Sequence, residues 1–242
     1  ITVSATAKGD NFVINGTKLF VEMAHVANYI ICVVRTRSGS QPEEGISLLI
    51  VDAKTPGIKC EVIPTIADDK LCEVRFENVL VPRKNLLGKL DSAWPLVQML
   101  LRKGAIIKCA ESIGGMQACV EMTVAYSKER VQYDRPIGAF QALQHIMADM
   151  WTAMQTSRYL VYQAAWMESA GMPCEKQASM AKAYVNEAYK NLTKWAVRLH
   201  GAIGTTYDHD ISLYYRRSKS ADVAFGGTDF HREIVARQIG LA

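Results

Sequence analysis

Short apolar runs that alternate with polar positions fill the first 90 residues, and this period of two indicates β-strands. The stretch NYIICVVRT is a continuous β-branched run, and GIKCEVIP and CEVRFENVLVP alternate between the two faces of a sheet. In NFVINGTKLFVE, two short runs flank Asn15-Gly16, the dipeptide that most strongly signals a tight hairpin. Closely spaced strands with turn residues between them predict a small β sandwich or barrel over residues 1–90.

The apolar period changes to that of a helix near the stretch KLDSAWP. Ser92 or Asp91 can cap this helix, and Pro95 then falls in its first turn, where the missing N–H is not needed. Apolar residues keep the helical spacing from there to the stretch SKER. The sequence therefore predicts that a long helix directly follows the β domain.

Two further long helices and two short ones complete the pattern. The second long helix is expected to end at Gly171 and the third near Gly201, because glycine readily adopts the left-handed backbone that ends many helices. The short helices are expected around residues 209–220 and 228–240. Long helices with short connections predict an antiparallel four-helix-bundle domain over residues 91–242, so the expected fold class is α+β.

Composition argues against several classes of protein. The net charge of +4 is spread along the chain, and Arg216-Arg217 fits a solvated helix face better than a nucleic-acid surface. The chain has no run of 18 or more apolar residues, which argues against a membrane span. Six cysteines without a CxxC pair argue against a zinc site and a disulfide framework, and they favour buried free thiols in a reducing, intracellular compartment.

Five stretches, in this order and at this spacing, resemble the acyl-CoA dehydrogenase family over all 242 residues. GDNFVINGTKLFV and VRFENVLVPRKNLLG are similar to the middle β domain of that family. SKERVQYDRPIGAFQALQHIMADM, RLHGAIGTTYDHDISLYYRRSKS and FGGTDFHREIVARQIG are similar to its C-terminal helical domain. The start, ITVSATAKGD, has neither an initiator Met nor the layout of a signal peptide. We therefore expect the family's N-terminal helical domain to precede residue 1.

The resemblance implies a flavoenzyme that binds FAD between the β domain and the bundle, usually as a homotetramer. Members of the family oxidise an acyl-CoA thioester: a carboxylate removes the α-proton while the β-hydrogen leaves as a hydride to the flavin. An electron-transferring flavoprotein usually reoxidises the flavin. The implied location is the cytoplasm, or the mitochondrial matrix in a eukaryote.

Several residues match flavin-contacting positions of the family. Arg130 and Tyr133 match residues that touch the FAD of a neighbouring subunit, and a guanidinium after a helix can clamp a pyrophosphate bidentately. The alternative for Arg130 is a bond to the last carbonyls of its own helix. In RLHGAIG, Arg198 stands where the family commonly has Gln, while Gly201 and Gly204 allow close approach of the backbone to a dinucleotide. They are equally compatible with ordinary helix stops.

Thr228 follows Gly226-Gly227 at the start of the last helix. Its backbone N–H and hydroxyl, together with the helix dipole, offer a site for an anion or for the ribityl chain of flavin. A plain helix cap without a ligand is the alternative.

Three departures from the family pattern concern the chemistry. The usual slot of the catalytic glutamate holds Gly226, and the slot used by a minority branch, on the first long helix, holds Gly104. The flavin contact of the β domain, normally Trp-x-Thr or Trp-x-Ser, is here Phe20-Val21-Glu22. Removal of an α-proton needs a base within hydrogen-bonding reach, which glycine cannot supply.

Three carboxylates are candidates for a replacement base. Glu22 would lie near the flavin N5 if the strand register is kept, and it is the one we select. Asp229 and Glu111 lie near the two vacated slots, but they fit a helix cap or a surface carboxylate better.

Two functions from different classes follow. The chain is an FAD-dependent acyl-CoA dehydrogenase-like enzyme with an atypical or lost base, or it is a non-catalytic subunit that lends its Arg130 region to FAD in a partner chain of a heteromeric dehydrogenase. A weaker third possibility is a domain pair that binds no flavin and serves assembly only.

Overall fold

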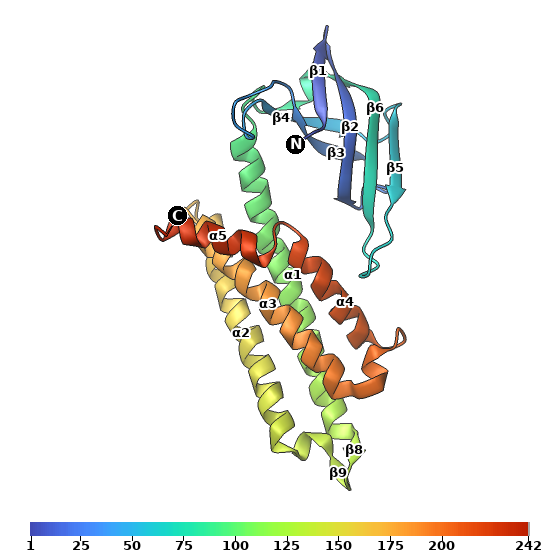
Figure 1. The fold of residues 1–242 in the computed structure, drawn as a ribbon, viewed down its shortest axis with the longest axis vertical. Coiled ribbons are helices and arrows are strands. Elements are labelled where there is room, and N and C mark those ends of the chain that lie inside the picture. Colours follow the sequence, from blue (N-terminus) through green and yellow to red (C-terminus); the bar gives the residue numbers. More distant parts are fainter. Residues whose placement is uncertain (242) are drawn as a thin grey trace. The chain divides into compact units, whose positions relative to one another are not determined.

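The computed structural model describes residues 1–241, and the chain divides into two compact units, Ile1–Leu100 and the residues from Leu101 onward. Figure 1 shows strands in the first unit and long helices in the second. The predicted boundary after residue 90 falls in the loop before the first helix, whereas the two units meet inside that helix. The α+β fold class, a β domain followed by a helical domain, is confirmed.

The first unit is built on one seven-stranded sheet with the order β5-β6-β2-β1-β3-β4-β7. Adjacent strands pair antiparallel except β1 and β3, which pair in parallel through Ser4 and Arg35 alone. The strands are β1 (Ser4–Lys8), β2 (Asn11–Glu22), β3 (Tyr29–Arg35), β4 (Ile46–Asp52), β5 (Ile58–Val62), β6 (Leu71–Pro82) and β7 (Leu86–Leu87).

The sheet folds over onto itself at the short β1–β3 junction. Inward side chains from β1, β2 and β6 on one side and from β3 and β4 on the other form one buried core, including Phe12, Ile14, Val34, Leu49 and Val81. Alternate residues of each strand contribute to this core, as the period-two pattern requires. The predicted small β sandwich is therefore present in the first unit.

The predicted hairpin at Asn15-Gly16 is wrong. Residues on both sides belong to the single strand β2, and the register with β6 shifts between Ile14 and Gly16, which marks a bulge. Gly16 has a φ of 126°, and a Cβ added there would lie 3.1 Å from the Cα of Val3, so the glycine serves an irregular strand and not a turn. The tight connection lies earlier, between Lys8 and Asn11, which pair across β1 and β2.

The second unit contains most of α1 and all of the later helices, and Pro95 is the second residue of α1 as predicted. The helices are α1 (Trp94–Glu129), α2 (Gln141–Ser169), α3 (Glu175–His200), α4 (Asp210–Val223) and α5 (Thr228–Gln238). A two-stranded hairpin of β8 (Val131–Gln132) and β9 (Arg135–Pro136) joins α1 to α2. Short 3-10 turns are found at Arg83–Asn85, Ile137–Ala139 and Gly201–Thr205.

The predicted helix ends hold. Gly171 has a φ of 67°, and the backbone N–H of Met172 reaches back to the carbonyl of Met167, which closes α2. Gly201, also at 67°, closes α3. α5 packs against α3, and the bundle core includes Met116, Met154 and Leu192.

Five of the six cysteines are buried, and Cys60 is exposed. Burial raises the pKa of Cys109 and of Cys119 to about 12, so both thiols stay protonated and unreactive near neutral pH. Within residues 1–241, no helix combines the length and the apolar character needed to cross a membrane.

Candidate functional site

The structure brings the two glycines at the expected base positions to one place. Gly104 lies in α1 and Gly226 lies in the loop between α4 and α5. The ring of Phe225, the residue just before Gly226, packs on Gly104: a Cβ added there would lie 2.6 Å from the ring Cδ1 and 2.8 Å from Cζ. The Phe225 ring therefore fills the space beside Gly104, and Gly226 directly follows Phe225 in the chain.

The backbone beside this ring takes an unusual conformation. Phe225 has a φ of 57° and Gly226 a φ of 103°, so two consecutive residues are in the positive region. A Cβ added at Gly226 would lie 2.5 Å from Cδ1 of Phe230 and 2.9 Å from Nε2 of His231. Any side chain at this position is therefore strained and meets two side chains of α5.

His231 is the buried group behind the Gly226 slot, and the sequence analysis missed it. Nε2 lies 2.9 Å from the carbonyl oxygen of Phe225, which can only accept, so Nε2 carries the hydrogen. Nδ1 then accepts from the hydroxyl of Ser179 at 3.2 Å. Burial lowers the pKa of His231, which keeps the imidazole neutral. The sequence signal that could have identified His231 is its position, one helical turn after the glycine pair.

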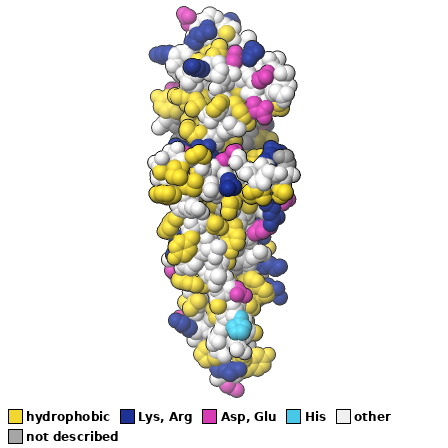
Figure 2. Space-filling model, turned by 90° about the vertical axis from the view of Figure 1, so that its left-hand side faces the viewer, with side chains coloured by type: hydrophobic (Ala, Val, Ile, Leu, Met, Phe, Trp, Pro, Cys, Tyr) yellow, Lys and Arg dark blue, Asp and Glu magenta, His cyan; other side chains and the backbone are white. Residues whose placement is uncertain are grey.

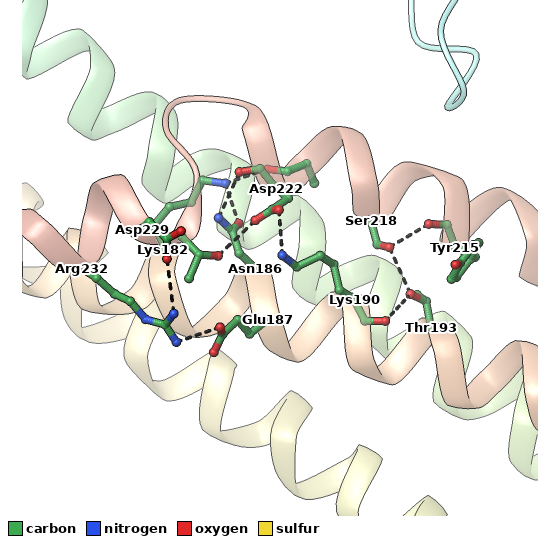
Figure 3. Close-up of polar contacts among 12 residues, drawn as sticks. Lys182, Asn186, Glu187, Lys190, Thr193, Tyr215, Ser218, Asp222, Asp229 and Arg232 are labelled. Carbon is green, nitrogen blue, oxygen red and sulfur yellow. Dashed lines mark hydrogen bonds and ion pairs between the residues drawn. The ribbon is translucent and has the colours of Figure 1, made fainter.

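Lys182 of α3 fixes the other end of the same loop (Figure 3). Its ammonium donates to the carbonyl of Ala221 and to Oδ1 of Asn186, both at 2.7 Å, and the residue is 1% exposed. Burial lowers the pKa of Lys182 to about 8. Pattern analysis could not find this residue, because a lysine in a helical stretch normally faces solvent.

Asp222 at the end of α4 receives three bonds from its neighbours. Lys190 donates to Oδ2 at 2.7 Å, Thr228 donates to Oδ1 at 3.1 Å, and the amide of Asn186 donates to the backbone carbonyl at 3.1 Å. Lys182, Asn186 and Lys190 follow one another at intervals of four, so a single ridge of α3 holds the last turn of α4 (Figure 3).

Thr228 is the first residue of α5, and Gly227 is the cap residue before it. Because Thr228 is buried and its hydroxyl is bonded to Asp222, the group left for an anion at this helix start is the backbone amide. The plain side-chain cap considered from the sequence is wrong.

Arg130 and Tyr133 lie together at the far end of α1. Tyr133 and Asp134, with φ values of 54° and 61°, form the two-residue turn of the β8–β9 hairpin, and Tyr133 is 88% exposed. Arg130 is exposed, and among residues 1–241 its guanidinium makes no hydrogen bond or ion pair. Its side chain does not bond to helix-end carbonyls, which leaves it available to a ligand.

The turn after α3 lies at the same end of the bundle. Tyr126, one turn before Arg130, stacks on His200 with ring centroids 4.5 Å apart and donates to its carbonyl at 3.3 Å. Gly204 is buried, and a Cβ there would lie 2.8 Å from the carbonyl of Val197, so packing within the chain explains this glycine. Gly201 is exposed.

Arg198 is exposed and lies over the ring of Trp195 at 4.7 Å. Its charge remains open to solvent at the end of α3. A stacked guanidinium in this position can still meet a phosphate.

The two groups of predicted residues are well separated in the second unit. Gly104 lies near the start of α1 and Arg130 just beyond its end, 26 positions later. At 1.5 Å per residue this spacing is about 39 Å. The Gly104–Gly226 slot and the Arg130–Tyr133 hairpin of one chain are therefore two separate places.

In the first unit, Phe20 sits in a bulge of β2. Its φ is 60°, the register with β6 shifts between Lys18 and Val21, and 63% of the residue is exposed. Glu22 is exposed at the end of β2, where it pairs with Leu71. The bulge turns these side chains outward, which suits contact with another molecule.

The two other candidate carboxylates are surface groups. The side chain of Asp229 is 93% exposed and pairs with Arg232 at 3.4 Å. Glu111 is 60% exposed and pairs with Lys108 at 2.7 Å. Neither carboxylate is buried, and each forms an ion pair with a basic side chain of its own helix.

Exposed aromatic side chains lie along α2. Figure 2 shows one face of the molecule, on which apolar side chains gather over the helical unit. Between 50% and 70% of each of these residues is exposed: Trp151, Tyr159, Tyr162 and Trp166. A groove of about 330 Å³ runs between α2 and α3 and is lined by residues that include Met150, Tyr184 and Trp195. So much apolar surface is unusual for a face that stays in water.

Comparison with known proteins places these features in a family. Residues 1–79 match the family model for the acyl-CoA dehydrogenase middle domain, and residues 92–240 match the model for the acyl-CoA dehydrogenase C-terminal domain. The chain is 33% identical over 238 residues to the mitochondrial short/branched chain specific acyl-CoA dehydrogenase of Bos taurus. This alignment covers 97% of this chain and 55% of the cattle protein.

Solved structures share the fold of this chain. A chain from a structure described as an electron transferring flavoprotein of Acidaminococcus fermentans is 32% identical, with a TM-score of 0.95 over 99% of this chain and 64% of that chain. An acyl-CoA dehydrogenase from Geobacillus kaustophilus is 26% identical, with a TM-score of 0.95 over 100% of this chain and 64% of that one. The chain thus spans less than two thirds of the length of these relatives.

Proposed function

Because the chain belongs to the acyl-CoA dehydrogenase family, we propose that it forms part of an FAD-dependent oxidoreductase that acts on an acyl-CoA thioester and whose usual base is lost or moved. The observation that carries the flavin assignment is Arg130, an exposed guanidinium without a partner among residues 1–241, beside the exposed ring of Tyr133. This donor set fits a pyrophosphate next to an aromatic group.

The residues fit FAD in distinct ways. Arg130 would bind the pyrophosphate and Tyr133 would pack on the cofactor, while Arg198 and the backbone at Gly201 would meet its phosphates. The backbone amides at the start of α5 suit an anionic or polar part of the ligand. Bound FAD supplies the hydride-accepting chemistry that no side chain of this chain has.

Glu22 remains the proposed replacement for the missing base. It is exposed at the end of β2 beside Phe20, the residue that stands at the flavin-contacting position of the resemblance. To act, its carboxylate would take the α-proton of the thioester directly, which requires the ligand to lie over this end of the strand.

Flavin uptake and reduction test this function. The full-length protein should be yellow, and anaerobic mixing with a panel of acyl-CoAs should bleach the oxidised flavin band with at least one of them. Glu22→Gln should slow this bleaching by about 100-fold or more, while Glu61→Gln, which changes an exposed glutamate of β5, should not. Unchanged rates in Glu22→Gln would remove Glu22 as the base, and a colourless protein that takes up no FAD would contradict a self-sufficient flavoenzyme.

A non-catalytic subunit is the second candidate, and one observation favours it. Side chains of this chain fill both expected base positions, whereas Arg130, about 39 Å away along α1, remains exposed. Such a chain can serve FAD in a partner without removing a proton itself. Co-purification with a second acyl-CoA dehydrogenase-like chain that carries the glutamate would support this candidate.

The proposed assembly is a homotetramer or a heteromeric acyl-CoA dehydrogenase, and the exposed aromatic residues of α2 support burial of that face against another chain. An electron-transferring flavoprotein is the proposed electron acceptor, to be tested by its reduction in the presence of acyl-CoA. The proposed location is the cytoplasm, or the mitochondrial matrix in a eukaryote.

A further inference from the structure

The space beside Gly104 is occupied by this chain's own aromatic ring, that of Phe225. A Cβ at Gly104 would overlap the ring of Phe225, while the surroundings of Gly114, ten residues further along α1, are open. Glycine at position 104 is therefore required by the packing of the Phe225 ring. It is the only residue type that lets the Phe225 ring lie flat on α1 at this point.

The conformation of Phe225 is held from both sides. His231 donates to the carbonyl of Phe225 at 2.9 Å, and Lys182 donates to the carbonyl of Ala221 at 2.7 Å. Both donors are buried, at 5% and 1% exposure. These bonds fix the backbone that directs the ring toward Gly104, while 38% of Phe225 stays exposed and presents an apolar surface outward.

Phe225 and Gly104 depend on each other. A side chain at position 104 needs the ring to leave, and a side chain at position 226 needs both the positive φ and the position of His231 to change. The absence of a carboxylate from both alternative positions is therefore built into the packing around α1 and α5, and a single substitution cannot introduce one without moving these side chains.

We propose that Phe225 is a plug residue: its ring takes the space of a carboxylate side chain at position 104, so that this position offers an acyl-CoA an apolar surface and no proton acceptor. The inference has two halves. The packing half, that the Phe225 ring excludes a side chain at position 104, stands on the structure alone. The functional half, that this removes a proton acceptor from the substrate, rests on the proposed binding of an acyl-CoA. A carboxylate introduced at position 104 can work only when the ring is removed as well.

A thermal double-mutant cycle on the full-length protein tests the packing half. Gly104→Ala should lower Tm, because the new methyl group meets the ring. In the Phe225→Ala background the same change should raise Tm by roughly 2–4 °C, because alanine is the better helix former. Gly114→Ala, in open space on the same helix, should raise Tm in both backgrounds. A Gly104→Ala shift of the same sign in both backgrounds would overturn the plug.

Deuterium exchange tests the functional half. The protein is kept reduced with dithionite, so that the flavin accepts no electrons, and butyryl-CoA in D₂O is the probe. The carboxylate introduced by Gly104→Glu would take the α-proton, leave the enolate, and return a deuteron to the same carbon. All variants also carry Glu22→Gln, which removes the proposed replacement base. In this background we expect exchange at the background rate with glycine or with glutamate at position 104, and exchange at least 10-fold faster for Gly104→Glu with Phe225→Ala.

The outcomes separate the two proposals. Equal exchange by Gly104→Glu with and without Phe225→Ala would overturn the plug, and so would a double variant that binds butyryl-CoA yet gains no exchange. Failure of every variant to bind any acyl-CoA would contradict the proposed function. The packing of Phe225 on Gly104 would then be tested by the thermal double-mutant cycle alone. Direct binding of the thioester is therefore measured beside the exchange.

Discussion

At the residue scale, the second unit concentrates its buried polar groups around one loop. His231 bonds to Phe225 in the segment that links α4 to α5, Lys182 bonds to the last turn of α4, and Asp222 in that turn bonds to Asn186 and Thr228. This arrangement makes the loop rigid where the family usually carries an ionised glutamate. The sequence revealed the two glycines but not their cause, because contacts between α1, α3 and α5 are not encoded in any local pattern.

Lys182 gives the stability of the protein a defined dependence on pH. Burial lowers its pKa to about 8, below the ordinary value of 10.5, so the unfolded chain binds more protons between these two values. Stability contributed by this residue therefore rises as pH increases from 8 toward 10.5. The neutral amine keeps two hydrogens for its bonds to Ala221 and Asn186.

Lys182→Met should remove this dependence. Urea unfolding at several pH values should show the free-energy gap between wild type and Lys182→Met growing in favour of the wild type by about 1–2 kcal/mol between pH 8 and 9.5. Lys190→Met is the control, since its side chain is only partly buried and its neighbour Asp222 balances its charge. A gap that stays constant with pH would show that Lys182 keeps its ordinary pKa in the fold.

At the element scale, the sequence predicted the helices well and the strand connections less well. Amphipathic spacing and glycine stops located the ends of α2 and α3, because these signals act within one or two turns. Asn15-Gly16 misled the hairpin prediction, since the same dipeptide serves a bulge in which Gly16 lies against Val3. A bulge is set by the neighbouring strand, and the local sequence does not contain it.

The β8–β9 hairpin shows the reverse case, a tight turn without glycine. Asp134 has a φ of 61°, which a residue with a Cβ adopts at a cost. Asp134→Gly should stabilise the protein by about 0.5–1 kcal/mol, and Asp134→Ala should destabilise it, because alanine adopts this left-handed backbone less readily than aspartate. Chemical denaturation measures both variants. Equal effects of the two variants would contradict the left-handed turn.

At the scale of the whole molecule, the candidate residues of the helical unit form two separate groups. One contains Gly104, Phe225 and Gly226, and the other contains Arg130 and Tyr133 at the opposite end of α1, about 39 Å away. A flavin held by Arg130 of one chain and by the β unit of another would require an oligomer. The family resemblance singled out Gly104, Gly226, Arg130 and Tyr133, whereas only the fold brings Phe225 onto Gly104 and shows how far apart the two groups lie.

Complementation between two defective chains tests this account most directly. Arg130→Ala removes the proposed phosphate-binding guanidinium, and Phe20→Asp, at an exposed position of the β unit, places a charge at the proposed flavin-contacting position. Each variant alone should purify as a folded oligomer with little FAD, and Lys128→Ala should keep its flavin as the matched control. Doubly tagged hybrids of the two variants should regain flavin absorbance, because one pairing joins an intact Arg130 to an intact Phe20 from the other chain. Hybrids that stay as colourless as their parents would contradict the sharing of the flavin site between chains.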